Sequence, residues 1–209
     1  MKHSRILALS GITGALVWLA GCASDGVQTP AGRPVAEMGA DEKGFVQGTG
    51  IESQDLVAVS DKMARSILAV PQIAQAATPP VIVLDPVQNK TRFPINKDIF
   101  LTRLRTRLNS QAVGKVQFLA RDRMVALERE RDMKQSGQVT ASSDPQKVEF
   151  KGADFFLTGS LESLSTRTSQ GQSDYVLYSF QLIDARTSVI VWEDAAEIKK
   201  QGLEDAAYR

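Results

Sequence analysis

The sequence predicts an α/β domain with a mixed central sheet, in which an antiparallel C-terminal meander is packed by helices. The run Val81–Leu84 is short, apolar and rich in β-branched residues, as in a strand buried on both faces. Apolar residues recur at helical spacing before and after that run. Three strand-like runs joined by short polar turns fill the last third of the chain. This order of elements indicates helices packed against one face of a sheet.

Residues 1–21 have the layout of a bacterial export signal. Basic Lys2 and Arg5 precede an uncharged run at residues 6–19, and the small residues Ala20 and Gly21 follow. The apolar run is about 14 residues long, whereas a permanent membrane-spanning helix needs about 20. We therefore expect a removable lipoprotein signal peptide.

The tetrapeptide Leu19-Ala20-Gly21-Cys22 resembles a lipobox, the signal at which bacterial lipoproteins are acylated and cleaved. We expect Cys22 to become the first mature residue and to carry an N-acyl group and an S-diacylglycerol group. The alternative, a buried unreactive thiol, is disfavoured because the polar stretch that follows offers no core and the chain has no second Cys. Several acyl chains hold a protein firmly on a membrane. Ala23 replaces the Asp that typically retains lipoproteins in the inner membrane, so we expect an anchor on the periplasmic side of the outer membrane.

Composition excludes several classes of site. The sequence has 25 Lys and Arg against 24 Asp and Glu, a balance that gives no electrostatic reason to expect nucleic acid as a partner. The single histidine, His3, leaves with the signal, and the single cysteine is consumed by lipid. A Ser-His-Asp triad, a Cys-His pair and zinc or copper sites with His or Cys ligands are therefore excluded. We expect no catalytic residue, no metal, no cofactor other than the lipid on Cys22, and no small-molecule substrate; carboxylate, lysine and tyrosine chemistry stays open.

The acylated Cys and a flexible tether are expected over residues 22–50, which are rich in Gly, Pro, Ala, Thr, Ser and Gln. Such a chain extends to roughly 90–100 Å at full stretch and spans about 30 Å on average. Its expected purpose is reach; the alternative is a spacer that keeps the domain off the lipid headgroups. Residues 51–209 then form one globular domain.

The first helix of the domain is expected from Ser53, a potential N-cap, to about Leu68. Its inward stripe has five members at helical spacing: Leu56, Val59, Met63, Ile67 and Val70. A turn-rich loop is expected over residues 85–94, after the first strand.

Asn96 is expected to cap the second helix, with Ile95 packed against Phe100 as a hydrophobic staple. Three residues of this helix should point inward: Phe100, Leu104 and Leu108. Arg103 and Arg107 share one face without an acidic neighbour, which indicates a solvated basic face or, alternatively, a site for an acidic partner.

A second strand is expected at residues 115–120, and Asp122 should open a third helix that ends near Gly137, a natural C-cap. The mixed charges at residues 128–132 indicate a solvated helix face. The C-terminal strands are expected at residues 153–167, 174–184 and 189–198. In the middle strand the residues alternate between an inward set, Val176, Tyr178, Phe180 and Leu182, and an outward set, Tyr175, Ser179 and Gln181.

Residues 84–95, Leu-Asp-Pro-Val-Gln-Asn-Lys-Thr-Arg-Phe-Pro-Ile, resemble the LpoB family of outer-membrane lipoproteins that activate peptidoglycan synthases. The resemblance extends, in the expected order, to residues 48–55, 153–159, 182–187 and 191–192. It implies a fold similar to the N-terminal domain of TolB. It also implies a partner, a bifunctional class A penicillin-binding protein, whose regulatory domain the lipoprotein docks on, and an activator that is not itself an enzyme. Ser188 stands where the family commonly has Gly after Ala-Arg-Thr.

Two other functions remain open. One is a structural lipoprotein that links the outer membrane to the cell wall. The other is a periplasmic hydrolase that uses the carboxylates of Asp85, Asp154 and Glu162, although Asp85 also suits a residue that caps the turn after a strand.

For partner binding we single out residues on loops and on the outward strand face, because loops on rigid scaffolds often carry function. These residues are Lys90, Arg92, Phe93, Arg167 and Tyr175. Phe93 equally suits a core residue beside Pro94.

Overall fold

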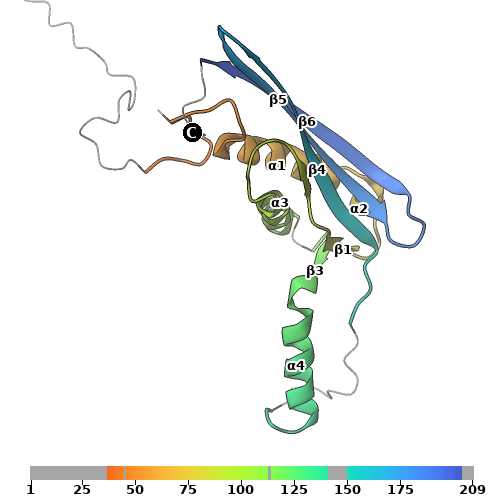
Figure 1. Ribbon diagram of the computed structural model, residues 1–209. Helices are drawn as coiled ribbons and strands as arrows, with labels where there is room; N and C mark the ends of the chain where they lie inside the picture. The colour runs from red at the N-terminus through yellow and green to blue at the C-terminus, as the bar shows by residue number, and fades with distance from the viewer. Residues whose placement is uncertain (1–36, 45, 113, 141–149, 204–209) are drawn as a thin grey trace, which may run out of the picture.

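The computed structural model describes residues 37–44, 46–112, 114–140 and 150–203; the predicted signal, Cys22 and most of the predicted tether lie outside these residues. Figure 1 shows the arrangement of the elements. In chain order they are α1 (Ser53–Leu68), α2 (Pro71–Ala74), β1 (Val81–Leu84), β2 (Gln88–Lys90), α3 (Asp98–Gln111), β3 (Gln117–Leu119), a 3-10 turn (Arg121–Arg123), α4 (Met124–Gln135), β4 (Phe155–Thr168), β5 (Gly171–Asp184) and β6 (Ile190–Gly202). No helix within the described residues is both long and apolar enough to cross a membrane.

The strands form one mixed sheet, as predicted. Its order is β3-β1-β4-β5-β6, and β2 pairs with β4 beside this path. The pairs β1–β3, β1–β4 and β2–β4 are parallel, whereas β4, β5 and β6 form a long antiparallel meander. The prediction of a loop throughout residues 85–94 was wrong at β2, because this strand is three residues long and carries no apolar alternation that would reveal it.

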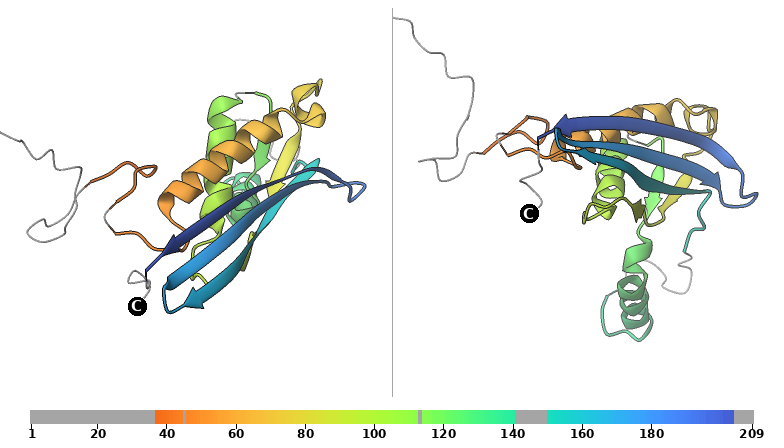
Figure 2. Two further views of the ribbon diagram at one scale, coloured as in Figure 1. Left: turned by 90° about the horizontal axis from the view of Figure 1, so that it is seen from above. Right: turned by 45° about the horizontal axis from the view of Figure 1, so that its top comes forward.

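Helices α1 and α3 lie together on one side of the three long strands (Figure 2). The predicted inward residues of α1, α3 and β5 lie in one hydrophobic core, with Leu56 packed at its margin; the exception is Val70, which follows α1 and is buried outside this cluster. The Phe100 ring contacts Tyr178 and Phe180, with ring centroids 5.5 and 6.4 Å apart. Phe180 also covers Gly159, where an added Cβ would lie 2.6 Å from its ring. The core is therefore the layer between β5 and the two helices.

The N-caps of the first two predicted helices each lie one residue from the predicted position. The N-cap of α1 is Glu52, which forms a reciprocal capping box with Asp55, so Ser53 is the first helical residue and not the cap. The N-cap of α3 is Lys97, and the Asn96 side chain accepts a hydrogen bond of 3.3 Å from the Asp98 amide. Several polar residues near a helix start can satisfy its free amides, and the sequence alone does not rank them.

Arg103 and Arg107 of α3 have an acidic neighbour after all, Asp61 of α1. The Arg107 guanidinium donates to both Asp61 carboxylate oxygens, at 2.7 and 2.6 Å, and Arg103 lies 3.8 Å from the same carboxylate. The hydrogen bonds from Arg107 hold the pKa of Asp61 below its ordinary value, against the opposing effect of burial. The prediction of a solvated basic face was therefore wrong, because Arg103 and Arg107 form part of the contact between α1 and α3.

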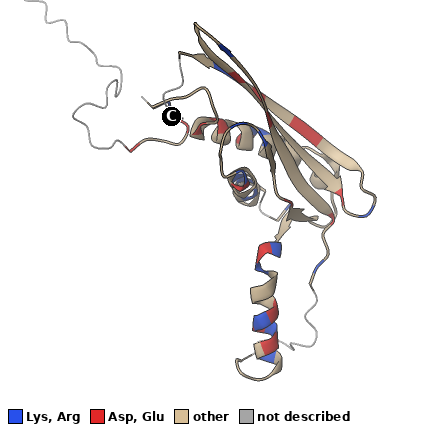
Figure 3. Cartoon of the chain, in the orientation of Figure 1, with Lys and Arg blue, Asp and Glu red and all other residues tan. Residues whose placement is uncertain are grey.

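The third predicted helix, α4, exists but does not cover the sheet. It follows the 3-10 turn, and Gly137 lies just beyond it at φ +72°. None of its 12 described residues is buried. Figure 3 shows acidic and basic residues intermixed along it, in agreement with the predicted solvated face. The expectation that helices cover the packed face thus holds for α1 and α3 and fails for α4.

The turn between β5 and β6 places Ser188 in a conformation that favours glycine. Its φ is +60°, and its amide donates a 2.9 Å hydrogen bond to the Asp184 carbonyl. The Asp184 side chain accepts from the amides of Thr187, at 2.7 Å, and Arg186, at 2.9 Å, which lowers the pKa of Asp184. The hydrogen bonds to Asp184 therefore stabilise a turn in which Ser188 must adopt a strained, left-handed backbone conformation.

Ser188→Gly is expected to raise the free energy of unfolding by roughly 0.5–1 kcal/mol. A left-handed residue with a Cβ costs roughly 1–2 kcal/mol, and the greater freedom of unfolded glycine cancels part of the gain. Urea unfolding measures the change. The matched control is Ser169→Gly in the β4–β5 turn, where φ is not positive and no gain is expected. Equal effects of the two substitutions would contradict strain at Ser188.

Candidate functional site

A fully buried acid, Asp174, joins four separate segments of the chain at the β4–β5 hairpin end of the sheet. Arg92, from the segment after β2, donates to both carboxylate oxygens, at 3.2 and 2.7 Å. Gln172 of β5 donates at 2.8 Å, and the hydroxyls of Thr49 and Ser165 also donate to the carboxylate. We call Asp174 and these four partners the Asp174 cluster.

The Asp174 cluster keeps its acid ionised. Burial by itself raises the pKa of Asp174, but hydrogen bonds from Arg92, Ser165, Thr49 and Gln172 together outweigh it and hold the pKa well below the ordinary value of a carboxyl group. Both carboxylate oxygens are occupied by donors. The cluster is therefore suited to fastening the chain and not to proton transfer.

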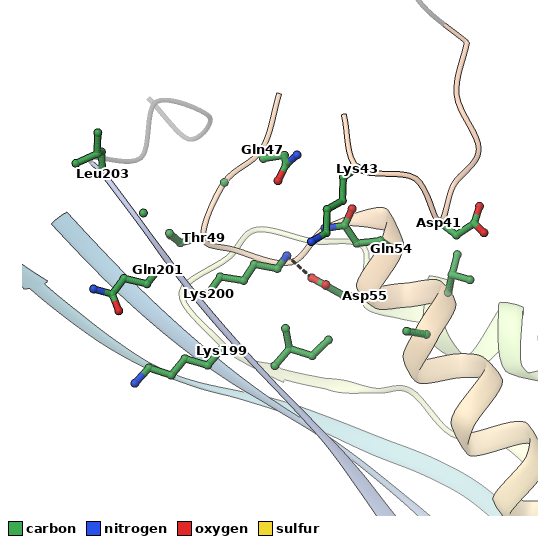
Figure 4. A pocket seen from close by; sticks show the side chains of 15 residues that line it. Asp41, Lys43, Gln47, Thr49, Gln54, Asp55, Lys199, Lys200, Gln201 and Leu203 are labelled. Atoms are coloured by element: carbon green, nitrogen blue, oxygen red, sulfur yellow. Dashed lines mark hydrogen bonds and ion pairs between the residues drawn. The ribbon is translucent and has the colours of Figure 1, made fainter. Parts of the chain in front are cut away.

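A second ion pair fastens the segment before α1. Lys200 of β6 donates to Asp55 at 2.6 Å and to the Gly50 carbonyl at 2.8 Å. Figure 4 shows Lys200 directed toward Asp55, while Lys199 projects from the other side of the strand. Thr49, which we predicted to lie in the tether, is buried against the sheet. The packed part of the chain thus includes residues 48–50, just before the predicted domain boundary.

A cavity of about 800 Å³ lies beside this ion pair (Figure 4). Its walls come from the segment before α1, the start of α1 and the end of β6. The charged groups lining it are mixed in sign: Asp41, Lys43, Asp55, Lys199 and Lys200. Two of these five charges neutralise each other, so the cavity has no strong preference for either sign of ligand.

The face of β4, β5 and β6 opposite the helices, which we call the open face, carries no helix of the described residues (Figure 2). Tyr175 of β5 lies on it, opposite Leu164 of β4 and Lys199 of β6. Burial and the neighbouring Glu197 carboxylate raise the pKa of Tyr175. A groove of about 350 Å³ crosses the open face between Glu162 and Glu193.

The five residues predicted to bind a partner do not form one patch. Lys90 pairs with Glu162 at 3.0 Å, beside the open face, and Tyr175 lies on that face. Arg167 is exposed near the hairpin tip. Arg92 turns into the Asp174 cluster, and Phe93 is 2% exposed, so its alternative assignment to the core is the correct one.

The three carboxylates considered for hydrolysis lie at separate places: Asp85 directly follows β1, with its amide bonded to the Leu157 carbonyl of β4, and the other two are at the start and in the middle of β4. Asp154 immediately precedes the strand and accepts a 2.8 Å hydrogen bond from the Val81 amide, whereas Glu162 is bound to Lys90. At about 3.3 Å per residue, these two acids are roughly 25 Å apart. Paired glycosidase carboxylates are separated by roughly 5–10 Å. The described residues also contain no group of three side chains suited to a metal ion.

Sequence reasoning missed Asp174, although a signal for it exists. Asp174 has the same parity as Val176, Tyr178 and Phe180, so extending the β5 alternation by one step predicts a carboxylate on the buried face. Such a group needs charged or multiple hydrogen-bond partners. The identity of those partners, Thr49 and Arg92 above all, has no counterpart in local sequence spacing.

Comparisons with known proteins match one family model and several solved structures. A family model described as the peptidoglycan-synthase activator LpoB matches residues 55–198. The LpoB C-terminal domain from Salmonella enterica is 18% identical with a TM-score of 0.39, over 65% of this chain and 94% of that chain. The LpoB C-terminal domain from Escherichia coli is 17% identical with a TM-score of 0.38, over 69% of this chain and 98% of that chain. A search of curated protein sequences found no match.

Asp174→Asn is expected to lower the free energy of unfolding at neutral pH by about 2–3 kcal/mol, through loss of the charged hydrogen bonds. Because the folded-state pKa is lowered, the carboxylate contributes stability above about pH 4 that is lost as the pH falls below it. The variant should therefore show a shallower loss of stability in acid. Urea unfolding between neutral pH and acid measures both effects.

The control is Asp85→Asn, at an exposed acid, which should change stability by at most about 0.5 kcal/mol. If the free energy of unfolding fell as steeply with decreasing pH in Asp174→Asn as in the unsubstituted chain, Asp174 would not be ionised in the folded state.

Proposed function

Because the chain belongs to the LpoB family of peptidoglycan-synthase activators, we propose that it binds and activates a bifunctional synthase, a class A penicillin-binding protein, from the periplasmic side of the outer membrane. The observation that carries this proposal is the family match, which runs from Asp55 in α1 to Ile198 in β6 and so includes every layer of the fold. In this proposal the chain acts by contact and performs no chemistry itself.

The way the chain enters the domain supports the action of a tethered head. Thr49 is bonded to Asp174, and Gly50 to Lys200, so the segment before α1 is fastened at the hairpin end of the sheet. In the proposal, Cys22 carries the lipid, and residues 22–47 connect it to this point. A pull on the connection would be resisted by the hydrogen bonds from Thr49 to Asp174 and from Lys200 to the Gly50 carbonyl, and the rest of the sheet surface stays available to a partner.

Three of the five residues predicted for partner binding remain proposed contacts, because they belong neither to the core nor to the Asp174 cluster: Lys90, Arg167 and Tyr175. We assign Arg92 and Phe93 a supporting role. The Arg92 guanidinium lies 4.4 Å from the centroid of the Phe93 ring, and both side chains hold the segment after β2 to the body of the domain.

Adding the purified mature chain to a purified class A penicillin-binding protein from the same organism is expected to raise the rate of glycan polymerisation. The reason is that contact with a regulatory domain favours the active form of the synthase. The readout is consumption of the lipid-linked precursor. An unchanged rate at saturating concentrations would remove the activator function, and retention on isolated cell wall would then favour the structural lipoprotein.

Cys22→Ala is expected to release the protein into the soluble periplasmic fraction, because the thiol that accepts the lipid is gone. Synthase binding by the purified chain should be unchanged, since Cys22 lies outside the matched residues 55–198. Fractionation of membranes and soluble periplasm checks the first expectation. Continued recovery of the variant in outer membranes would contradict the lipid anchor.

A further inference from the structure

We propose that the synthase docks on the open face and inserts a basic side chain into the groove between Glu162 and Glu193. This inference rests on the proposed function and gives its partner a binding surface. The open face differs in charge and shape from the helix-packed face. Both differences indicate what kind of partner surface would bind there.

The groove lies over small residues of β4 and β5, and Gln88 and Lys90 of β2 also line it. Ser160 of β4 lies opposite Ser179 of β5, which lies opposite Ala195 of β6. Larger side chains flank this row, with Gln181 and Glu193 on one side and Glu162 and Leu177 on the other. The result is a hollow of about 350 Å³, enough for one extended side chain of a partner.

The carboxylates of the open face differ from those of the helix-packed face in their partners. On the helix side of the sheet, Asp174 of β5 and Asp55 and Asp61 of α1 are each bound to a cation of this chain. On the open face, Glu193 accepts from the amide of Gln181 at 2.7 Å and from the hydroxyl of Ser179 at 3.4 Å, both of which are neutral.

The other two carboxylates of the open face are also weakly neutralised. Glu197 lies beside the phenol of Tyr175, a neutral group. Glu162 is paired with Lys90, but both side chains are about half exposed, and such surface pairs contribute little. Three carboxylates therefore face Lys90 and Lys199, which leaves the open face acidic.

Exposed apolar side chains lie beyond both ends of the groove. Leu164, 69% exposed, adjoins Tyr175 toward the hairpin, and Phe156 and Ile190 are exposed toward the other end of the strands. Apolar contacts around a small number of charged groups are typical of protein interfaces. Complementary charge adds specificity and speeds association. The partner that fits is a protein surface with a lysine or arginine flanked by apolar residues.

The test measures the dissociation constant between the mature chain and the purified class A penicillin-binding protein, both kept in detergent. Glu193→Lys reverses the charge of the groove, and Ser160→Arg fills it while leaving all three carboxylates. Each is expected to weaken binding at least about tenfold, as for a central interface residue. Glu193→Gln should lower the salt dependence of the association rate.

The matched control is Glu128→Lys on α4, which makes the same charge change at an exposed site on another element. It should leave binding within about twofold. Urea unfolding of each variant verifies that the fold is retained. A variant that loses stability is replaced by Leu164→Glu, at an exposed position that lies outside the core.

The outcomes separate the two proposals. Binding and activation by the unsubstituted chain, together with unchanged affinity of Glu193→Lys and Ser160→Arg, would overturn the open-face site and leave the activator function standing. Absence of synthase binding by the unsubstituted chain would overturn the function itself. Loss of retention on isolated cell wall in the same variants, with synthase binding intact, would assign the groove to glycan and also overturn the inference.

Discussion

The buried carboxylate of Asp174, paired with the partly exposed Arg92, is the constraint on which the hairpin end of this fold depends. A carboxylate that is removed from water must be compensated by donors, and an uncompensated buried charge is strongly destabilising. Here the donors come from the segment before α1, from the segment after β2 and from two strands. One desolvated charge therefore forces four parts of the chain to meet, and the departure of any one of them leaves the carboxylate with fewer donors.

The two faces of the sheet differ in how their charges are compensated. On the helix-packed face, apolar side chains fill the space under α1 and α3, and the acids at the margins are each bound to a cation. On the open face, alternation places hydroxyls, amides and carboxylates whose partners are mostly neutral. The first arrangement stabilises the fold, and the second leaves electrostatic and apolar contacts to be completed by another molecule.

The position at which the chain enters the domain would orient the proposed activator relative to its membrane anchor. Because Thr49 and Gly50 are bonded at the hairpin end, a lipid-anchored chain would reach the domain from that end. The long strands then extend away from the point of attachment, with the open face along their length. A head held in this way presents its sheet to a partner without placing it against the tether.

The sequence by itself determined the class of the fold and most of its elements. Apolar spacing in α1, α3 and β5 predicts their buried sides, because hydrophobic burial follows local periodicity. The absence of histidine and free thiol from the predicted mature chain restricted the chemistry, and residues 84–95 indicated the family. The tertiary structure alone decided the rest. It assigned Asp61 to Arg107, Thr49 and Arg92 to Asp174, β2 to the sheet and α4 to solvent. Ion pairs and short strands depend on residues that are distant in the chain. The spacing of residues along the sequence therefore does not predict them.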